Sequence, residues 1–268
     1  MSLNKPKKDE WKNLKNYSDY IAEPKMDGER CTLQNIDGEI SVVRDSGKVK
    51  NTMYPELLDI DIPDGTVLDG EVCIPKNDYY ADFNTFQLRM NLQDNVKIQQ
   101  YLKSPDTTVS FVAFDILQHD YNKVIDEPWK TRRGILETIP TSERLKRITT
   151  HTPDELYPMV QKYGMEGIVL KNKQSPYERD WVKMKNIVER DFRVSGYNTS
   201  DKRFISTITI EDIESGNPMG NVTYFGPRFP QTEDAARKLK GSIAVIQYLE
   251  SGAKNKPRFP VLKEIRHG

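Results

Sequence analysis

The sequence has few cysteines, no long apolar run and no net charge. The 268 residues include only two cysteines, Cys31 and Cys73. Both lie in apolar, β-prone stretches, so we expect buried free thiols and exclude a four-cysteine zinc site. No apolar run approaches the roughly 18 residues of a membrane-spanning helix, and no secretory signal follows the early lysines. We therefore expect a cytoplasmic protein without a membrane partner.

The charge of the chain is balanced. Forty basic and forty acidic residues cancel, so bulk charge gives no indication of a nucleic-acid partner. A balanced total still allows a basic face, because partners respond to the local potential. Residues 1–17 carry five lysines against two acidic residues, which predicts a solvated terminus or, alternatively, an arm that contacts phosphates.

Residues 23–30 (EPKMDGER) place a lysine beside an Asp-Gly pair, between β-prone runs at residues 20–22 and 31–33. Asp-Gly between two strands predicts a tight turn, because glycine tolerates positive φ. Lys25 would then stand at a strand end where a ligand can reach it. An amine attacks only when unprotonated, and burial with nearby positive charge lowers its pKa. Lys25 is therefore a candidate nucleophile, and a charged hairpin on the surface is the alternative.

The stretch from residue 21 to 185 mixes strands and helices. Short β-prone runs between turn signals up to residue 74 predict an antiparallel sheet. Residues 79–101 are predicted to be helical, with Phe86 in the core and Arg89 on the surface. Apolar spacing and capping signals predict further helices at residues 127–139 and 152–163.

Residues 180–185 predict a strand with Trp181, Lys183 and Lys185 on one face. Two lysines on one face repel each other unless an anion lies between them, so this strand favours a bound phosphate. After residue 189 the pattern changes to short strands punctuated by proline and glycine, with one helical stretch at residues 232–239. This pattern predicts a small β-barrel of OB-fold size, and hence two domains, 1–188 and 189–268.

Five motifs occur in an order and spacing that resembles the covalent nucleotidyltransferases, which are ATP-dependent DNA ligases, RNA ligases and mRNA capping enzymes. The resemblance covers nearly the whole chain. It implies an α+β fold: a nucleotidyltransferase (adenylation) domain of antiparallel sheets with helices, followed by a C-terminal OB-fold β-barrel. The motifs are KMDGER (25–30), LDGEV (68–72), FVAFDIL (111–117), EGIVLK (166–171) and WVKMK (181–185).

The resemblance implies a three-step reaction with ATP, Mg²⁺ and nicked double-stranded DNA, in which Mn²⁺ substitutes for Mg²⁺. Lys25 would attack the α-phosphate of ATP and form a lysine–AMP intermediate. The AMP would pass to the 5′-phosphate at the nick, and the 3′-hydroxyl would then displace it. Such chemistry needs charge neutralisation and in-line positioning more than acid–base catalysis.

By the same resemblance, Glu23 would accept a hydrogen bond from the adenine amino group. Phe114 would stack on the adenine ring, and core packing is its alternative role. Arg30 and Glu71 would hold the ribose hydroxyls, where a plain turn carboxylate is the alternative for Glu71.

The resemblance also implies residues that handle the phosphates. Glu71 and Glu166 would lie at the metal. Lys183 and Lys185 would neutralise the AMP phosphate and help to depress the pKa of Lys25.

Three arginines are candidates for DNA contact by resemblance: Arg44, at the 5′-phosphate of the nick, and Arg258 and Arg266, in the last barrel strand. The residues around Arg44 match the family less cleanly. The family pattern continues after the last arginine as Asp-Lys, whereas Arg266 is followed by His267 and Gly268. The barrel is therefore expected to contribute less to the first step.

The branch of the family follows from smaller features. Two cysteines cannot form the zinc site of NAD-dependent ligases. Residues 258–260 favour a DNA ligase over a capping-type guanylyltransferase, and the expected C-terminal OB-like barrel fits a DNA ligase better than an RNA ligase. Both remain alternatives. A binding module that has lost catalysis is a further alternative, but the nucleophile and both phosphate lysines are present. We expect a monomeric, minimal ligase of the bacteriophage type, located in the host cytoplasm and serving DNA repair, replication or recombination.

Overall fold

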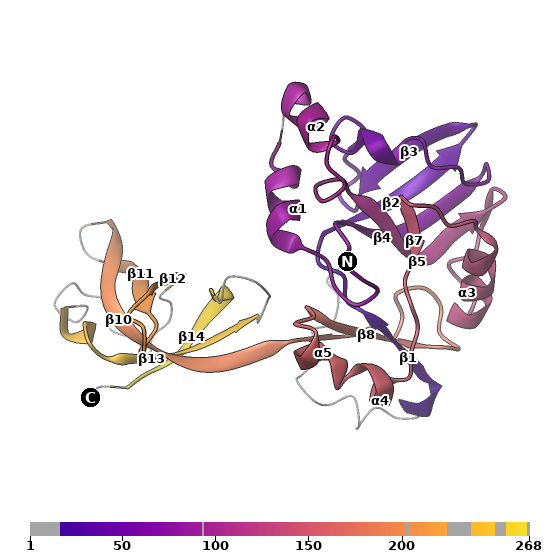
Figure 1. Ribbon diagram of the computed structural model, residues 1–268. Coiled ribbons are helices and arrows are strands. Elements are labelled where there is room, and N and C mark those ends of the chain that lie inside the picture. Colours follow the sequence, from indigo (N-terminus) through magenta and orange to yellow (C-terminus); the bar gives the residue numbers. More distant parts are fainter. Residues whose placement is uncertain (1–16, 93, 202–203, 224–236, 250–255, 267–268) are drawn as a thin grey trace. The chain divides into compact units, whose positions relative to one another are not determined.

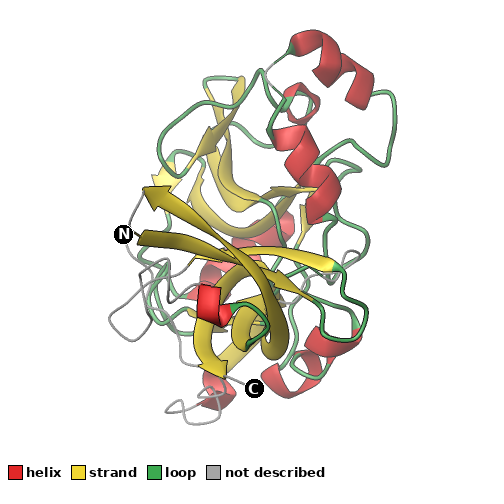
Figure 2. Cartoon of the chain, turned by 90° about the vertical axis from the view of Figure 1, so that its left-hand side faces the viewer, coloured by secondary structure: helices red, strands yellow, loops and turns green. Residues whose placement is uncertain are grey.

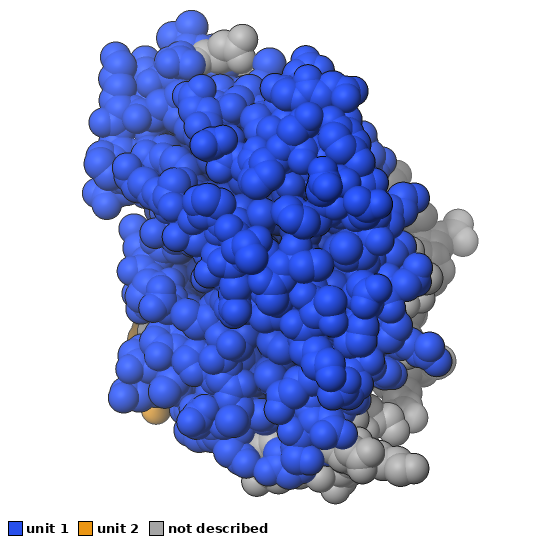
Figure 3. All heavy atoms as spheres, turned by 90° about the vertical axis from the view of Figure 1, so that its right-hand side faces the viewer, with its two compact units in different colours: residues 1–185 blue, residues 186–268 orange. Residues whose placement is uncertain are grey.

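The computed structural model describes residues 17–92, 94–201, 204–223, 237–249 and 256–266. The chain divides into two compact units, Met1–Lys185 and Asn186–Gly268, which are coloured separately in Figure 3. The lysines of the expected N-terminal arm, which all precede residue 17, lie outside the described residues. No helix in the described part of the chain is long and apolar enough to cross a membrane.

The first unit is built on a six-stranded sheet (Figure 1). Its pairs are antiparallel, except that β7 (Leu145–Arg147) runs parallel to β5. Burial alternates along β2, as expected of a strand with one face on a core. The apolar core under the sheet includes both Leu33 and Phe111, which are fully buried. The main order is β3 (Glu39–Arg44), β2 (Glu29–Ile36), β4 (Thr66–Cys73), β5 (Ser110–His119) and β6 (Asn122–Lys123).

A second sheet of the first unit joins β1 (Tyr20–Pro24), β8 (Gly167–Asn172) and β9 (Val182–Lys185). The expected tight turn between the strands around Lys25 is wrong, because β1 and β2 belong to different sheets. Gly28 has no positive φ in this connection. Instead, a Cβ on Gly28 would lie 2.2 Å from the carbonyl oxygen of Val72, so the glycine permits a close backbone approach.

The helices of the first unit follow the sequence signals with three adjustments. The expected helical stretch at residues 79–101 forms α1 (Phe83–Met90) and α2 (Asn95–Tyr101). In α3 (Trp129–Thr138), Pro128 precedes the helix as its N-cap residue. The helix expected at residues 152–163 is two short ones, α4 (Pro153–Leu156) and α5 (Met159–Lys162), separated at Pro158, which cannot donate a backbone hydrogen bond.

Two local predictions have opposite outcomes. The capping box at α4 is confirmed, with Thr152 and Glu155 bonding each other's backbone amides. The expectation of a surface arginine in α1 is wrong, because Arg89 is fully buried, donates to the carbonyl of Met53 and forms an ion pair with Glu56. Both cysteines are buried and free, as expected.

The second unit is an antiparallel five-stranded sheet, and strands dominate it in Figure 2. The edge strands β12 and β14 contact each other. Phe192 and Ile208 lie in the apolar core enclosed by the strands. Of the helix expected at residues 232–239, residues 232–236 lie outside the described part. The order is β12 (Pro218–Thr223), β11 (Phe204–Glu211), β10 (Ile187–Asp201), β13 (Ile243–Leu249) and β14 (Arg258–Arg266).

Candidate active site

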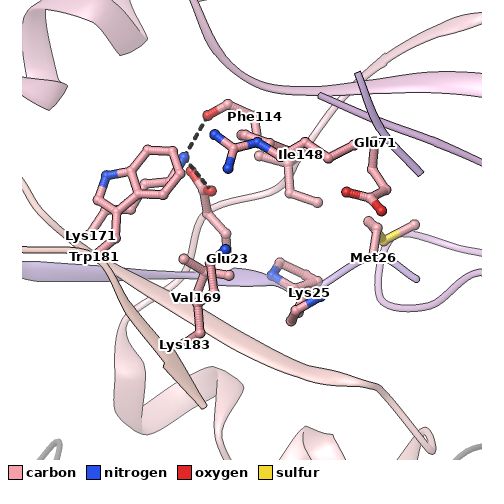
Figure 4. A pocket seen from close by; sticks show the side chains of 12 residues that line it. Glu23, Lys25, Met26, Glu71, Phe114, Ile148, Val169, Lys171, Trp181 and Lys183 are labelled. Carbon is pink, nitrogen blue, oxygen red and sulfur yellow. Dashed lines mark hydrogen bonds and ion pairs between the residues drawn. The ribbon is translucent and has the colours of Figure 1, made fainter. Parts of the chain in front are cut away.

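A pocket in the first unit brings together six of the sequence-predicted residues, from both sheets (Figure 4). Strands β1 and β2 and the connection between them, strands β4 and β5, and strand β9 each contribute at least one of them. Ile148 and Val169 add apolar walls. The six predicted residues that line the pocket are Glu23, Lys25, Arg30, Glu71, Phe114 and Lys183.

Lys25 is held by an ion pair with Glu166. Its Nζ donates to Glu166 Oε2 over 2.6 Å, and its backbone amide donates to the carbonyl of Gly167 over 3.0 Å. The Glu166 side chain is 6% exposed and the Lys25 side chain 20%. Burial lowers the pKa of Lys25, but the charges of Glu166 and Glu71 outweigh burial and the pKa is raised. The expectation of a depressed pKa is therefore wrong for the chain without ATP.

Glu71 is a buried carboxylate whose surroundings disfavour its ionised form. Burial raises its pKa to about 8, and the nearby carboxylates Glu166, Asp69 and Asp27 add to the shift against the lowering effect of Lys25. A cation bound beside Glu71 would stabilise its ionised form and oppose this shift of its pKa.

Glu23 lies at the opposite, buried side of the pocket, where it is 1% exposed. Its Oε2 pairs with Lys171 Nζ at 2.8 Å, while its Oε1 has no hydrogen-bond partner within the described structure. Burial raises the pKa of Glu23, and Lys171 opposes that shift. A buried carboxylate oxygen without a partner is costly and can be satisfied by a donor on a ligand.

Lys171 also donates to the carbonyl oxygen of Phe114 over 2.7 Å and lies 4.2 Å from the ring centroid of Trp181 (Figure 4). The rings of Phe114 and Trp181 meet edge to face, with centroids 6.1 Å apart. Neither Lys171 nor Trp181 was assigned a role in the site from the sequence. The signals that could have found them are the end of the EGIVLK run and the alternation of Trp181 with Lys183.

Arg30 is fixed by two carboxylates and a tyrosine hydroxyl. It donates two hydrogen bonds to Asp69, at 2.8 and 3.2 Å, and one each to the Tyr177 hydroxyl and Glu178. Burial opposes the charge of Arg30, but the hydrogen bonds with Asp69 and Glu178 prevail and raise its pKa. Tyr177 and Glu178 were not predicted from the sequence, because they lie in the loop between β8 and β9 without a motif.

The two lysines of β9 do not share one environment. Lys183 lines the pocket, and burial together with Arg30 and Lys25 lowers its pKa. Lys185 is 44% exposed and lies 3.6 Å from Glu166. Glu166 therefore connects Lys185 to Lys25.

The three arginines expected at DNA lie elsewhere. Arg44, the last residue of β3, is 44% exposed and lies 3.1 Å from Glu29. Arg266 pairs with Asp191 and Glu264 in the second unit, each at 3.2 Å. Arg258 lies over the ring of Phe259 in the same unit, 5.6 Å from the centroid.

The chain is similar to several proteins that are named as DNA ligases or DNA ligase-like proteins. The SPbeta prophage-derived DNA ligase-like protein LigB of Bacillus subtilis is 27% identical over 71% of this chain and 70% of its own length. DNA ligase C2 of Mycolicibacterium smegmatis is 28% identical over 65% of this chain and 52% of its own length, so the chain spans about half of that relative. Among solved structures, a Lig E DNA ligase has a TM-score of 0.66 at 17% identity, covering 99% of this chain and all of that one.

The family is set by a broader match. The model of the ATP dependent DNA ligase domain matches residues 2–186, which include the whole pocket. The chain belongs to the family of ATP-dependent DNA ligase domains.

Proposed function

We propose that the protein is an ATP-dependent DNA ligase that seals nicks with a 5′-phosphate and a 3′-hydroxyl in duplex DNA, with Lys25 as the nucleophile. One observation carries the proposal: an apolar pocket has an ion-paired lysine toward one side and an unpartnered buried carboxylate oxygen toward the other. A purine base with an exocyclic amino group fits the carboxylate of Glu23, and Phe114 and Trp181 offer apolar surface to its ring. Its phosphates would then extend toward Lys25.

In the first step the Lys25 amine attacks the α-phosphorus of ATP. A nitrogen–phosphorus bond forms, and the bond from the α-phosphorus to the bridging oxygen breaks, so pyrophosphate leaves. The protonated side chain loses two protons in all: one passes to Glu166 Oε2, 2.6 Å away, and the other to water or to the departing pyrophosphate. Lys183 and Lys185 offset the charge of the AMP phosphate. The AMP then moves to the 5′-phosphate of the nick, and the 3′-hydroxyl displaces it.

The acidic side of the pocket fits a divalent cation. Glu71 and Glu166 would hold Mg²⁺, with Mn²⁺ as its substitute, and the ion would supply positive charge against the phosphate oxygens. No group of three or more possible metal-binding side chains of His, Cys, Asp or Glu occurs in the described ranges of the chain. We therefore expect the phosphates and water to supply most of its ligands.

The second unit would be an OB-fold barrel that contacts DNA. Its all-β composition and the contact between the edge strands β12 and β14 support a closed barrel. Arg258 and Arg266 lie on its last strand, and Arg44 of the first unit would meet the 5′-phosphate. The Lig E structure is described as DNA binding with a minimal scaffold, which supports DNA binding by a chain of this size.

The test is the intact mass after incubation with Mg²⁺ and, separately, ATP, GTP or NAD. We expect an AMP adduct with ATP alone, its absence in Lys25→Ala, and its removal by pyrophosphate. A GMP adduct would instead indicate a capping-type enzyme. An unmodified chain with every nucleotide, which pyrophosphate leaves unchanged, would indicate a binding module without catalysis.

A further inference from the structure

A second charged cluster lies outside the pocket, at the start of β2. Glu29 is the first residue of β2 and is 5% exposed. Two cations approach its Oε1: Arg44 Nε at 3.1 Å and Lys50 Nζ at 3.4 Å. Tyr54, which is fully buried, donates its hydroxyl to Glu29 Oε2 over 2.7 Å. The buried carboxylate thus accepts a hydrogen bond at Oε2 and has two ion pairs, but no hydrogen bond, at Oε1.

The members of this cluster differ in their access to ligands. The Lys50 side chain is 9% exposed and the Arg44 side chain 44%. The Arg44 guanidinium donates no side-chain hydrogen bond within the described ranges, and its ion pair with Glu29 has its shortest approach at Nε. Asp45 lies 3.9 Å from Arg44 Nε, but it is 71% exposed and therefore screened by water. Arg44 alone can present its remaining N–H groups outward.

The register of the sheet places Arg44 at the functional end of the first unit. Strands β2 and β3 are antiparallel, with Arg44 opposite Cys31, so the end of β3 lies beside the start of β2. The connection that carries Lys25 leads directly into that start. Because side chains alternate along a strand, Glu29 points away from Arg30 and is no part of the pocket.

We propose that Glu29 is a positioning residue: supported by Lys50 and Tyr54, it holds the Arg44 guanidinium in place for the 5′-phosphate of the nick. The inference rests on the proposed function and deepens it. A surface arginine without a partner samples many rotamers, and ordering it weakens binding. An ion pair through Nε to a fixed carboxylate orders the side chain in advance. It leaves the terminal N–H groups free for a phosphate.

The test compares the affinity of the protein for two nicked duplexes, one with a 5′-phosphate and one with a 5′-hydroxyl at the nick. We expect the wild type to favour the phosphate by about tenfold or more. Glu29→Gln keeps the shape of the side chain but removes the charge, so most of this preference should disappear while the 5′-hydroxyl nick binds as before. The matched control is Glu137→Gln, which removes the carboxylate partner of Arg133 on α3 and should keep the preference.

A double-mutant cycle separates positioning from a general structural role. If Glu29 acts through Arg44, Glu29→Gln should have no further effect in an Arg44→Ala background. The inference would be overturned if the effects of Glu29→Gln and Arg44→Ala multiplied in the double mutant. It would also be overturned if Glu29→Gln weakened the binding of both nicks equally or left the preference unchanged. Should Glu29→Gln fail to fold, Tyr54→Phe removes one hydroxyl group only and should show a smaller loss of the same preference. An unchanged preference in Tyr54→Phe would then overturn the inference.

Failure of this inference is distinguishable from failure of the proposed function. The same preparations are assayed for AMP labelling by ATP. A wild type that forms no AMP adduct contradicts the proposed function. A wild type that forms the adduct and binds nicks, beside a Glu29→Gln variant with the wild-type preference, contradicts the role of Glu29 alone.

Discussion

At the scale of single residues, the charged side chains of the pocket are arranged to interact with charged ligands. Lys25 is neutralised by Glu166, and Glu71 lies among further carboxylates with its pKa raised to about 8. A raised pKa on Lys25 keeps its amine protonated and unreactive until ligands change the balance of charge. We therefore expect ATP and a cation to switch the nucleophile on together.

The first prediction concerns stability against pH without ligands. Between its usual pKa of 4.5 and about 8, Glu71 holds a proton in the folded chain that the unfolded chain has released. The free energy of unfolding should therefore decrease as pH rises through this interval, by at most about 1.4 kcal/mol per pH unit from this group. Glu71→Gln should flatten this slope in urea unfolding followed by tryptophan fluorescence. An equal slope in both proteins would show that Glu71 ionises normally.

The second prediction concerns the buried pair at the far side of the pocket. Lys171 is 1% exposed and pairs with Glu23, so Lys171→Met leaves the buried carboxylate of Glu23 without its cation. Asp115, 3.6 Å from Lys171, keeps its ion pair with Arg132. We expect a loss of about 3–5 kcal/mol in the free energy of unfolding. The exposed Lys130, changed to methionine in the same way, should shift it by less than about 0.5 kcal/mol. Similar values for the two variants would mean that the pair contributes little.

At the scale of secondary-structure elements, close backbone contacts position the nucleophile. Gly167 begins β8 with a φ of 153°, and a Cβ there would lie 2.0 Å from the carbonyl oxygen of Met184 on β9. The Gly167 carbonyl also accepts the backbone amide of Lys25. Glu166 pairs with Lys25, and its neighbour Gly167 packs β8 closely against β9. These two residues of the EGIVLK motif thus make the position of Lys25 depend on the packing of the two strands.

The third prediction follows from this contact. Gly167→Ala should destabilise the first unit by more than about 1 kcal/mol and reduce formation of the AMP adduct, because β9 must move and Glu166 with it. Gly134→Ala is the matched control, since Gly134 lies inside α3 with nothing within 4 Å of the added Cβ. It should stabilise the protein by about 0.5–1 kcal/mol. Adduct formation in Gly167→Ala at the wild-type rate would contradict the positioning role of β8.

Some of these elements could be predicted from the sequence, and others could not. Local signals gave the strands and the capping box at Thr152, because alternation and capping act over a few residues. Local signals also singled out Lys25 and Lys183, whereas the other predicted pocket residues followed from the resemblance to the nucleotidyltransferases. Contacts between distant segments could not be predicted from the sequence. They include the separate sheets of β1 and β2, the burial of Arg89, and the hydrogen bond from Lys171 to the carbonyl oxygen of Phe114. The position of a lysine or arginine in the sequence does not show whether it will form a buried ion pair with a carboxylate from another element.

At the scale of the whole molecule, the net charge of zero leaves DNA binding to local groups. With Arg44, Arg258 and Arg266 on phosphates, the logarithm of the affinity for nicked DNA should fall against the logarithm of salt with a slope of about −3 or steeper. Arg44→Ala should reduce this slope by about one, whereas the exposed Arg179→Ala should not. Binding that is independent of salt would show that these arginines do not reach phosphates.

The central claim is that AMP passes from Lys25 to a DNA end. The most direct measurement loads the protein with AMP from α-labelled ATP, removes free nucleotide and adds a nicked duplex in a single turnover. The account predicts that the label moves to the 5′-phosphate of a nick lacking a 3′-hydroxyl, and leaves as free AMP from a complete nick as the strand is sealed. Label that stays on the protein with every DNA substrate, or moves only to an RNA end, would contradict it.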